Sequence, residues 1–184
     1  MEKIWTDQRR LETWLAIELL ACEAFAELGI IPREAAKEIR EKATFDVHRV
    51  DEIEKTTKHD VIAFLTNVGE SIGPLSKHLH YGLTSSDVLD TSLAILLKEA
   101  SDLILDDLRR LLKVLRDKAF QFKNTLMIGR THGVHAEPIT FGLKLATWYA
   151  ETQRNLQRME RAKEAISVGK ISGAVGTFAH IPPF

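Results

Sequence analysis

The longest helical pattern in the sequence, from Ser86 to about Phe122, constrains the fold more than any other feature. Leucines and valines recur along it at helical spacing, and neither glycine nor proline interrupts it. At a rise of about 1.5 Å per residue, such a helix spans on the order of 55 Å. A second pattern with an apolar stripe, from Pro138 to about Val168, spans roughly 45 Å. Helices this long are not needed to close a small monomeric core, so they predict a helical bundle and favour one that subunits share.

Shorter helical patterns precede the two long ones. Residues 7–28 form an amphipathic pattern that Thr6 can cap and Gly29 can end. Pro32 then opens a shorter helix, and Asp46 can cap a third. Each boundary rests on a residue whose side chain or backbone suits a helix end.

No stretch of the sequence alternates apolar and polar residues in the manner of a β-strand. The order of elements therefore predicts an all-α fold. We expect an N-terminal helical domain at residues 1–85, followed at residues 86–184 by the first long helices of a central helical bundle domain that is incomplete.

Charge and cysteine content exclude several classes of protein. The 25 lysines and arginines nearly balance the 26 aspartates and glutamates. The chain therefore has no excess of positive charge that would attract nucleic acid or an anionic membrane surface. No apolar run reaches the roughly 18–20 residues of a membrane helix, and the first residues lack the apolar core of a secretion signal. Cys22, the single cysteine, is expected to be buried in a helix in a reducing compartment. We therefore expect a cytoplasmic, globular protein.

The stretch from Gly129 to Pro138 concentrates polar and conformationally permissive residues between the two long helical patterns. Its glycines permit sharp turns, and Pro138 fits the first turn of the following helix. A loop at a helix start is therefore expected, displaying Arg130, Thr131, His132 and His135. Histidine titrates near neutral pH and can give or take a proton. On composition alone, a proton-transfer site and a plain helix connection with solvated histidines fit this stretch equally well.

A second polar cluster, Lys58-His59-Asp60, interrupts the helical pattern before Val61. A helix start offers backbone N–H donors and a positive dipole end, and Lys58 adds positive charge, so an anion could be bound there. A turn capped by Asp60 explains the same residues, and the sequence alone favours that interpretation.

A third polar loop, from Lys77 to Asp87, contains His80 and the consecutive hydroxyl residues Thr84, Ser85 and Ser86. Ser85 or Ser86 is expected to cap the next helix. The remaining hydroxyls are then free to hydrogen-bond a ligand carboxylate or phosphate near the positive helix end.

A glycine-rich stretch runs from Gly169 to Thr177. It lacks the spacing of a phosphate-binding P-loop and has no strand before it. We interpret it as a loop beside a ligand or as a connection between helices.

Other chemistries fit the sequence less well. The histidine pairs 78/80 and 132/135 have no cysteine or carboxylate partners at zinc-site spacing, so no metal is predicted. Ser85 and Ser86 have histidines nearby but not the context of a known nucleophile. A helical interaction module without chemistry of its own is therefore the remaining alternative to an enzyme.

Four separated motifs resemble those of one group of enzymes. Gly-Arg-Thr-His at 129–132 and Thr-Ser-Ser-Asp at 84–87 resemble the fumarase/aspartase superfamily of helical lyases. Longer strings narrow the resemblance to the adenylosuccinate lyase family. These strings are GRTHGVHAEP at 129–138, KHDV at 58–61, HYGLTSSD at 80–87 and GKISGAVG at 169–176. The resemblance covers essentially the whole chain.

The resemblance implies a homotetrameric lyase whose active sites are shared between subunits and need no metal or organic cofactor. Members of the family eliminate fumarate from adenylosuccinate, giving AMP, and from SAICAR, giving AICAR, in purine synthesis. By resemblance His132 is the acid that protonates the departing nitrogen, and His59 is expected beside it. The resemblance also implies a set of substrate-binding residues. They are Lys58, His59, Asp60, His80, Thr84, Ser85 and Thr131.

Two departures from the family pattern are present. The sequence lacks the Ser-Ser-x-Met-Pro-x-Lys-x-Asn loop whose serine is the family's general base, and no arginine-tyrosine pair precedes Ile4. We therefore expect this chain to be an N-terminal fragment without lyase activity of its own. Another lyase of the superfamily and a non-catalytic helical oligomerisation module are the alternatives.

Overall fold

The computed structural model describes residues 1–181, which form two compact units. The first unit comprises residues 1–97 together with the described residues from 167 onward, and the second comprises residues 98–166. The long helix α5, Ser85–Gln121, contributes residues to both units. The domain boundary expected at residue 85 stays a prediction about the full-length protein.

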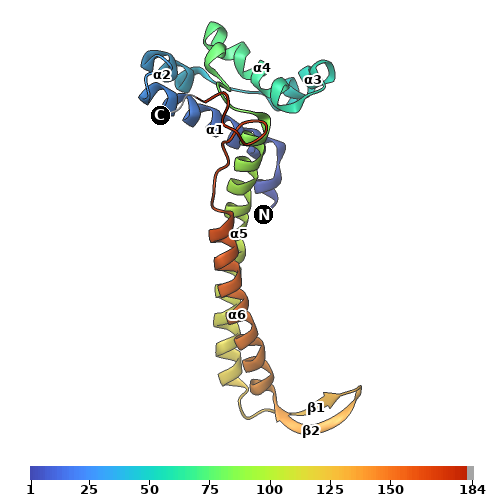
Figure 1. Ribbon diagram of the computed structural model, residues 1–184. Helices are drawn as coiled ribbons and strands as arrows, with labels where there is room; N and C mark the ends of the chain where they lie inside the picture. The colour runs from blue at the N-terminus through green and yellow to red at the C-terminus, as the bar shows by residue number, and fades with distance from the viewer. Residues whose placement is uncertain (182–184) are drawn as a thin grey trace. The chain divides into compact units, whose positions relative to one another are not determined.

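The first unit is built mainly from helices, of which α1 to α4 follow the order predicted from the sequence (Figure 1). They are η1 (Glu2–Trp5), α1 (Asp7–Glu27), α2 (Arg33–Lys42), α3 (Val47–Thr57), α4 (Asp60–Ile72) and the 3₁₀ helix η2 (Gly73–His78). Two predicted caps are confirmed. Thr6 Oγ1 accepts a hydrogen bond from the backbone N of Arg9 at 3.1 Å, and Asp46 Oδ1 accepts one from the backbone N of Arg49 at 2.8 Å.

The core of the first unit joins α1, α4 and the start of α5. Trp14 of α1 and Phe64 of α4 are almost completely buried and pack edge to face, with ring centroids 5.5 Å apart. Val88, in the first turns of α5, is fully buried in the same cluster. Burying one such side chain contributes about 1.5–3 kcal/mol. The core therefore fixes the start of α5, which carries the hydroxyl residues, against α1 and α4.

Cys22 is buried in this core as a free thiol, as predicted. Burial raises the pKa of the Cys22 thiol to about 11, and the carboxylates of Glu18 and Glu23 add to the rise. The thiol therefore stays protonated at neutral pH and acts as a small apolar side chain.

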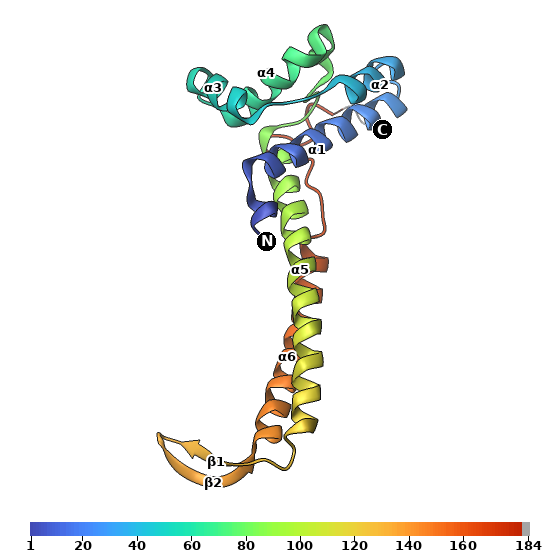
Figure 2. The ribbon, with the colours of Figure 1, turned by 180° about the vertical axis from the view of Figure 1, so that it is seen from behind.

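The second unit contains α5 from residue 98 onward and the helix α6, Phe141–Ile166, which lie side by side in both views (Figures 1 and 2). The helices have 37 and 26 residues, so both predicted long helices are confirmed. Between them Arg109 Nη2 lies 3.4 Å from Glu160 Oε1, and Lys163 pairs with Asp102.

Two helices cannot bury both of their apolar stripes. Leu105, Leu115 and Leu145 are buried, whereas many large apolar side chains of this unit are exposed. The exposed ones on the helices include Leu103, Leu111, Val114, Phe120, Leu143 and Trp148. The helices of a bundle normally cover such stripes with further helices.

The stretch predicted as a loop before a helix at Pro138 is instead a β-hairpin, so that prediction was wrong. The antiparallel strands β1 (Leu126–Thr131) and β2 (Val134–Thr140) are joined by His132 and Gly133. Both turn residues have positive φ angles, 51° and 75°, which is the geometry that suits a two-residue hairpin turn. The fold remains all-α apart from this hairpin, the one sheet among residues 1–181.

Side-chain capping explains why the helix starts after the hairpin and not at Pro138. Thr140 Oγ1 accepts a hydrogen bond from the backbone N of Leu143 at 3.1 Å, so α6 begins at Phe141. Gly129 permits the close approach of the two strands, because a Cβ at this position would lie 2.5 Å from the carbonyl oxygen of Glu137.

None of the helices formed by residues 1–181 combines the length and the apolar character that crossing a membrane requires.

Candidate active site

The turn between α3 and α4 carries Lys58, His59 and Asp60. Lys58 ends α3 in a left-handed conformation with a φ of 53°. His59 precedes α4, and its Nδ1 accepts a hydrogen bond from the backbone N of Ile62 at 3.4 Å. His59 therefore caps α4, and the prediction that Asp60 does so was wrong. Asp60 is the first residue of the helix, and its Oδ1 lies 3.4 Å from Nδ1 of His59.

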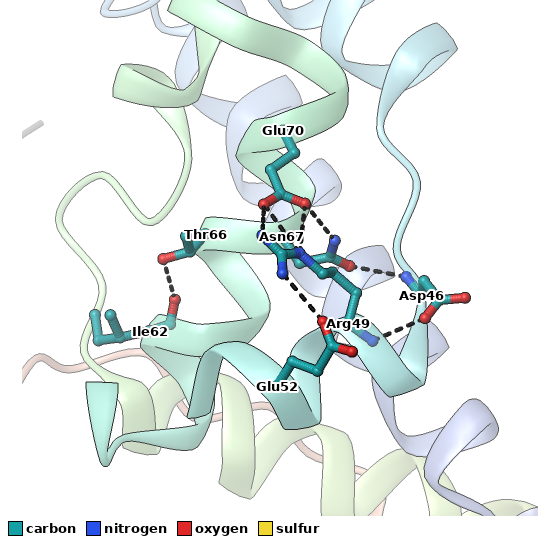
Figure 3. A network of polar contacts seen from close by, with 7 residues as sticks. All are labelled: Asp46, Arg49, Glu52, Ile62, Thr66, Asn67 and Glu70. Atoms are coloured by element: carbon teal, nitrogen blue, oxygen red, sulfur yellow. Dashed lines mark hydrogen bonds and ion pairs between the residues drawn. The ribbon is translucent and has the colours of Figure 1, made fainter. Parts of the chain in front are cut away.

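A network of hydrogen bonds and ion pairs joins α3 to α4 and so positions the turn between them (Figure 3). Arg49 on α3 donates to both carboxylate oxygens of Glu70 on α4, with Nη2 2.8 Å from Oε1. The buried Asn67 accepts a hydrogen bond from the backbone N of Asp46 at 2.8 Å and donates one to Glu70 Oε2 at 3.1 Å. Hydrogen bonds from Arg49, and then from Asn67, lower the pKa of Glu70. The network therefore includes a charged carboxylate at neutral pH.

The hydroxyl residues lie at the start of α5, next to His59. Because α5 begins at Ser85, Thr84 occupies the position before the helix, and the prediction that Ser85 or Ser86 caps it was wrong. Ser85 Oγ lies 3.5 Å from Nε2 of His59. A hydroxyl both donates and accepts, so Ser85 can form this hydrogen bond with either tautomer of the His59 ring. The structure thus brings together two of the residues predicted to bind substrate.

Asp87 holds the backbone around these hydroxyl residues in place. Its buried carboxylate accepts hydrogen bonds from the backbone N of Thr84 at 3.0 Å, of Ser172 at 3.0 Å and of Gly173 at 3.2 Å. Lys170 Nζ donates a fourth at 2.8 Å. Burial by itself raises the pKa of Asp87, but the hydrogen bond from Lys170 and those from the backbone outweigh it, and the pKa is lowered. The carboxylate is therefore charged at neutral pH.

The glycine-rich stretch from Gly169 to Thr177 is consequently tied to the start of α5. Besides the bonds to Asp87, Thr91 Oγ1 accepts a hydrogen bond from the backbone N of Lys170 at 2.9 Å and lies 3.1 Å from its carbonyl oxygen. In both ribbon views the segment that follows α6 runs beside the first turns of α5 (Figures 1 and 2). That this stretch also faces a ligand stays a prediction.

His80 pairs with a buried carboxylate on α1. Glu18 is 1% exposed, and its Oε2 accepts a hydrogen bond from the backbone N of His80 at 2.8 Å. Its Oε1 lies 2.6 Å from Nδ1 of His80. His80 has a left-handed backbone with a φ of 57°. One carboxylate therefore fixes both the backbone and the ring of a residue predicted to bind substrate.

Lys58 and Asp60 line two different surface pockets of the first unit. Asp60 lines one of about 280 Å³ together with Trp5 and Arg10. Lys58 lines another of about 360 Å³ together with Glu54. Among residues 1–181 no group of three or more His, Cys, Asp or Glu side chains is arranged to hold a metal ion.

Thr131 and His132 belong to the second unit, unlike the other predicted site residues. His132 lies exposed at the hairpin turn, directly after Thr131 at the end of β1. Beside the turn, Arg130 Nη2 donates to Nε2 of His135 at 3.3 Å. The expectation that His132 acts next to His59 stays a prediction.

The sequence prediction missed Glu18 and Lys170, which hold site residues in place. Glu18 left a signal, because it lies on the apolar stripe of α1 four positions from both Trp14 and Cys22. A charged residue at such a position is buried only with a partner. Nothing in the spacing of Lys170 indicated its contact with Asp87.

Comparison with known proteins places these residues in a family. A family model described as "Lyase" matches residues 1–184. The chain belongs to this lyase family. Two curated relatives that match along the whole chain are both named adenylosuccinate lyase. The one from Bacillus subtilis (strain 168) is 59% identical over 184 residues, which are 100% of this chain and 43% of that protein. The one from Staphylococcus saprophyticus is 57% identical over 183 residues, which cover 100% of this chain and 42% of that protein.

Solved structures of proteins with other names share the fold of this chain. A fumarate lyase from Mesorhizobium sp. BNC1 has a TM-score of 0.92 and 28% identity, over 97% of this chain and 43% of that chain. A β-carboxy-cis,cis-muconate cycloisomerase from Acinetobacter calcoaceticus has a TM-score of 0.91 and 25% identity, over 98% of this chain and 44% of that chain. The chain therefore spans less than half the length of the relatives it matches, and the resemblance of its motifs to the lyase superfamily is confirmed.

Proposed function

We propose that the full-length protein containing this chain is an adenylosuccinate lyase, which eliminates fumarate from adenylosuccinate to give AMP and from SAICAR to give AICAR. The observation that carries the proposal is the identity of 59% and 57% to adenylosuccinate lyases along the entire chain. The more distant fumarate lyase and cycloisomerase share the fold at 28% and 25% identity. Because one fold serves several reactions, this higher identity is what favours the purine substrate.

The reaction requires an acid and a base. A base removes a proton from Cβ of the succinyl group, a double bond forms between Cα and Cβ, and the electron pair of the C–N bond passes to nitrogen. An acid then protonates that nitrogen, so that fumarate and the purine amine separate. General acid catalysis of this kind contributes about 10²–10⁴-fold. The base, in this proposal, is the serine of the family loop that is absent from these 184 residues.

Each predicted site residue has a role in this scheme. His132 is the acid, and His59 supports it or the substrate. The hydroxyls of Thr84, Ser85 and Thr131 donate to the substrate carboxylate, where charge develops in the transition state. Lys58, Asp60 and His80 contact the nucleotide. The contact between Ser85 and His59 supports this set, since it places a hydroxyl donor beside an imidazole at a helix start.

We further propose that the protein is a cytoplasmic homotetramer whose active sites combine residues of several subunits. The exposed apolar side chains of α5 and α6, among them Phe120 and Trp148, support assembly through the long helices. The proposal needs no metal and no organic cofactor, because an acid, a base and hydrogen-bond donors suffice for the elimination.

Fumarate release by the purified full-length protein tests the function. We expect turnover of adenylosuccinate and SAICAR, and none of argininosuccinate or aspartate. Turnover of one of the latter substrates would identify another lyase of the superfamily instead. If the complete oligomer neither turns over nor binds adenylosuccinate or AMP, the protein is a non-catalytic helical module and the proposal fails.

A further inference from the structure

Glu18 is an unusual residue for the interior of a helix-packed core. It lies on the buried face of α1, is 1% exposed, and has Trp14 and Cys22 one turn away on either side. An ionised carboxylate at such a position is strongly destabilising unless hydrogen bonds replace the lost water. Both of its oxygens are occupied by a single residue, His80, which is 62 positions away in the sequence.

The two contacts constrain different parts of His80. The backbone N–H donates to Oε2 at 2.8 Å and so holds the backbone of His80 at a φ of 57°. Residues other than glycine rarely adopt this conformation. The contact at 2.6 Å between Oε1 and Nδ1 holds the ring. Because a carboxylate only accepts, Nδ1 must be the donor. The carbonyl of His80 also accepts a hydrogen bond from Leu83 N at 3.2 Å, directly before Thr84.

This arrangement leaves the other ring nitrogen, Nε2, for a further partner. The His80 side chain is 18% exposed, in contrast to 1% for that of Glu18, so the pair is buried at the carboxylate and open at the imidazole. A carboxylate behind an imidazole fixes the tautomer and the ring orientation, as in many catalytic and metal-binding histidines. A pair that served packing alone would not need a strained histidine backbone, because asparagine or glycine adopts this conformation more easily.

We infer that Glu18 is a positioning residue of the active site, which holds the His80 imidazole so that its Nε2 contacts the substrate. The inference rests on the proposed function and deepens it. Glu18 touches no reacting atom and acts only through His80. Removing its charge therefore weakens substrate binding and leaves the chemical step nearly unchanged.

The test uses Glu18→Gln in the full-length protein, with fumarate release from adenylosuccinate as the readout. The amide keeps the shape of the side chain but presents an N–H₂ group to one of the two donors of His80. We expect KM to rise at least about tenfold and kcat to stay within about threefold. The matched control is Glu23→Gln, five residues further along α1, which breaks a surface pair with Arg40 at 2.7 Å and should leave KM unchanged.

A double-mutant cycle separates positioning from a purely structural role. In a His80→Ala background, Glu18→Gln should change KM by less than about twofold, because the residue through which it acts is gone. An equal rise in KM in both backgrounds, or a loss of thermal stability with no change in KM, overturns the inference. If Glu18→Gln does not fold, Glu18→Asp decides by the same criterion, since its shorter carboxylate cannot reach both donors. Failure of both variants to fold means that Glu18 serves folding alone.

The outcome also distinguishes this inference from the proposed function. A wild-type protein that releases no fumarate from adenylosuccinate overturns the function, and the inference with it. An active wild type whose Glu18→Gln variant has an unchanged KM overturns the inference alone.

Discussion

Lys170 Nζ lies 2.8 Å from Oδ1 of Asp87, a fully buried carboxylate 83 positions earlier in the chain. Together with three backbone N–H groups, this contact joins the glycine-rich stretch after α6 to the first turn of α5. Ser85, one of the hydroxyl residues proposed to bind the substrate, belongs to that turn, and Thr84, another, directly precedes it. The stability of the turn can therefore be tested through Asp87.

Replacing Asp87 by alanine should lower the free energy of unfolding of the full-length protein by about 3 kcal/mol or more. The substitution leaves the buried backbone donor of Gly173 and the partly buried donors of Thr84 and Ser172 without their acceptor, and a buried unsatisfied group is destabilising by about 1–3 kcal/mol. Denaturant unfolding measures the effect. Asp90→Ala, at an exposed position of the same helix, is the control and should stay within about 0.5 kcal/mol of wild type. Equal effects of the two substitutions would contradict the role of Asp87.

The same carboxylate should make stability depend on pH in the acid range. The pKa of Asp87 is lowered from the ordinary 3.8, so the ionised group contributes stability that is fully present above pH 3.8 and is lost as pH falls through the lower folded-state pKa. We expect the difference in free energy of unfolding between wild type and Asp87→Asn to be constant near neutral pH and to shrink below pH 3.8. Unfolding curves at a series of pH values measure this difference. A difference that persists unchanged in strong acid would rule the mechanism out.

The polar network between α3 and α4 allows a buried member, Asn67, to be compared with an exposed one, Arg49. Asn67→Ala should lower the free energy of unfolding by about 2 kcal/mol, because the buried Asn67 side chain is lost and the backbone N–H of Asp46 loses its acceptor. Arg49→Ala should lower it by less than Asn67→Ala does, although Arg49 makes more hydrogen bonds, because its side chain is 48% exposed and solvent screens its ion pairs. Thermal unfolding of the two variants gives the ranking. A larger effect of Arg49→Ala would reverse our interpretation of the network.

Local chemistry made most helix boundaries predictable from the sequence. Thr6 and Asp46 cap their helices through hydrogen bonds to residues three positions on, so the whole interaction lies within one turn. The long helices were predictable for a related reason, because an uninterrupted apolar stripe needs no distant partner to be seen. The four motifs added the lyase family, which the match along the whole chain bears out.

Distant contacts were not predictable from the same patterns. Glu18 and His80 are 62 positions apart, and Asp87 and Lys170 are 83 apart, so no periodicity connects them. The hairpin was missed for another reason. Pro138 is compatible both with the start of a helix and with a strand at the edge of a sheet. In the structure it lies in β2, and the hydroxyl of Thr140, two residues later, caps α6.

The chain of 184 residues by itself should release no fumarate from adenylosuccinate. It lacks the serine loop that supplies the base in the proposed reaction, and it spans less than half the length of its adenylosuccinate lyase relatives. A fumarate assay on the purified chain, beside the full-length protein at equal concentration, provides the measurement. Comparable rates from the two samples would mean that the base lies within these residues.

The role of His132 can be tested with little risk to folding, because the residue is exposed at the tip of a hairpin. In the full-length protein, His132→Ala should lower kcat by about 10²-fold or more, the scale of a lost general acid. Its φ of 51° is unfavourable for alanine, so His132→Asn, which tolerates this conformation, serves as the second variant and should lose as much activity. His48→Ala, at an exposed position on α3, is the matched control and should retain full turnover. If either His132 variant keeps wild-type kcat, the proton must come from another group, and His59, which lies 3.5 Å from the Ser85 hydroxyl, becomes the next acid to test.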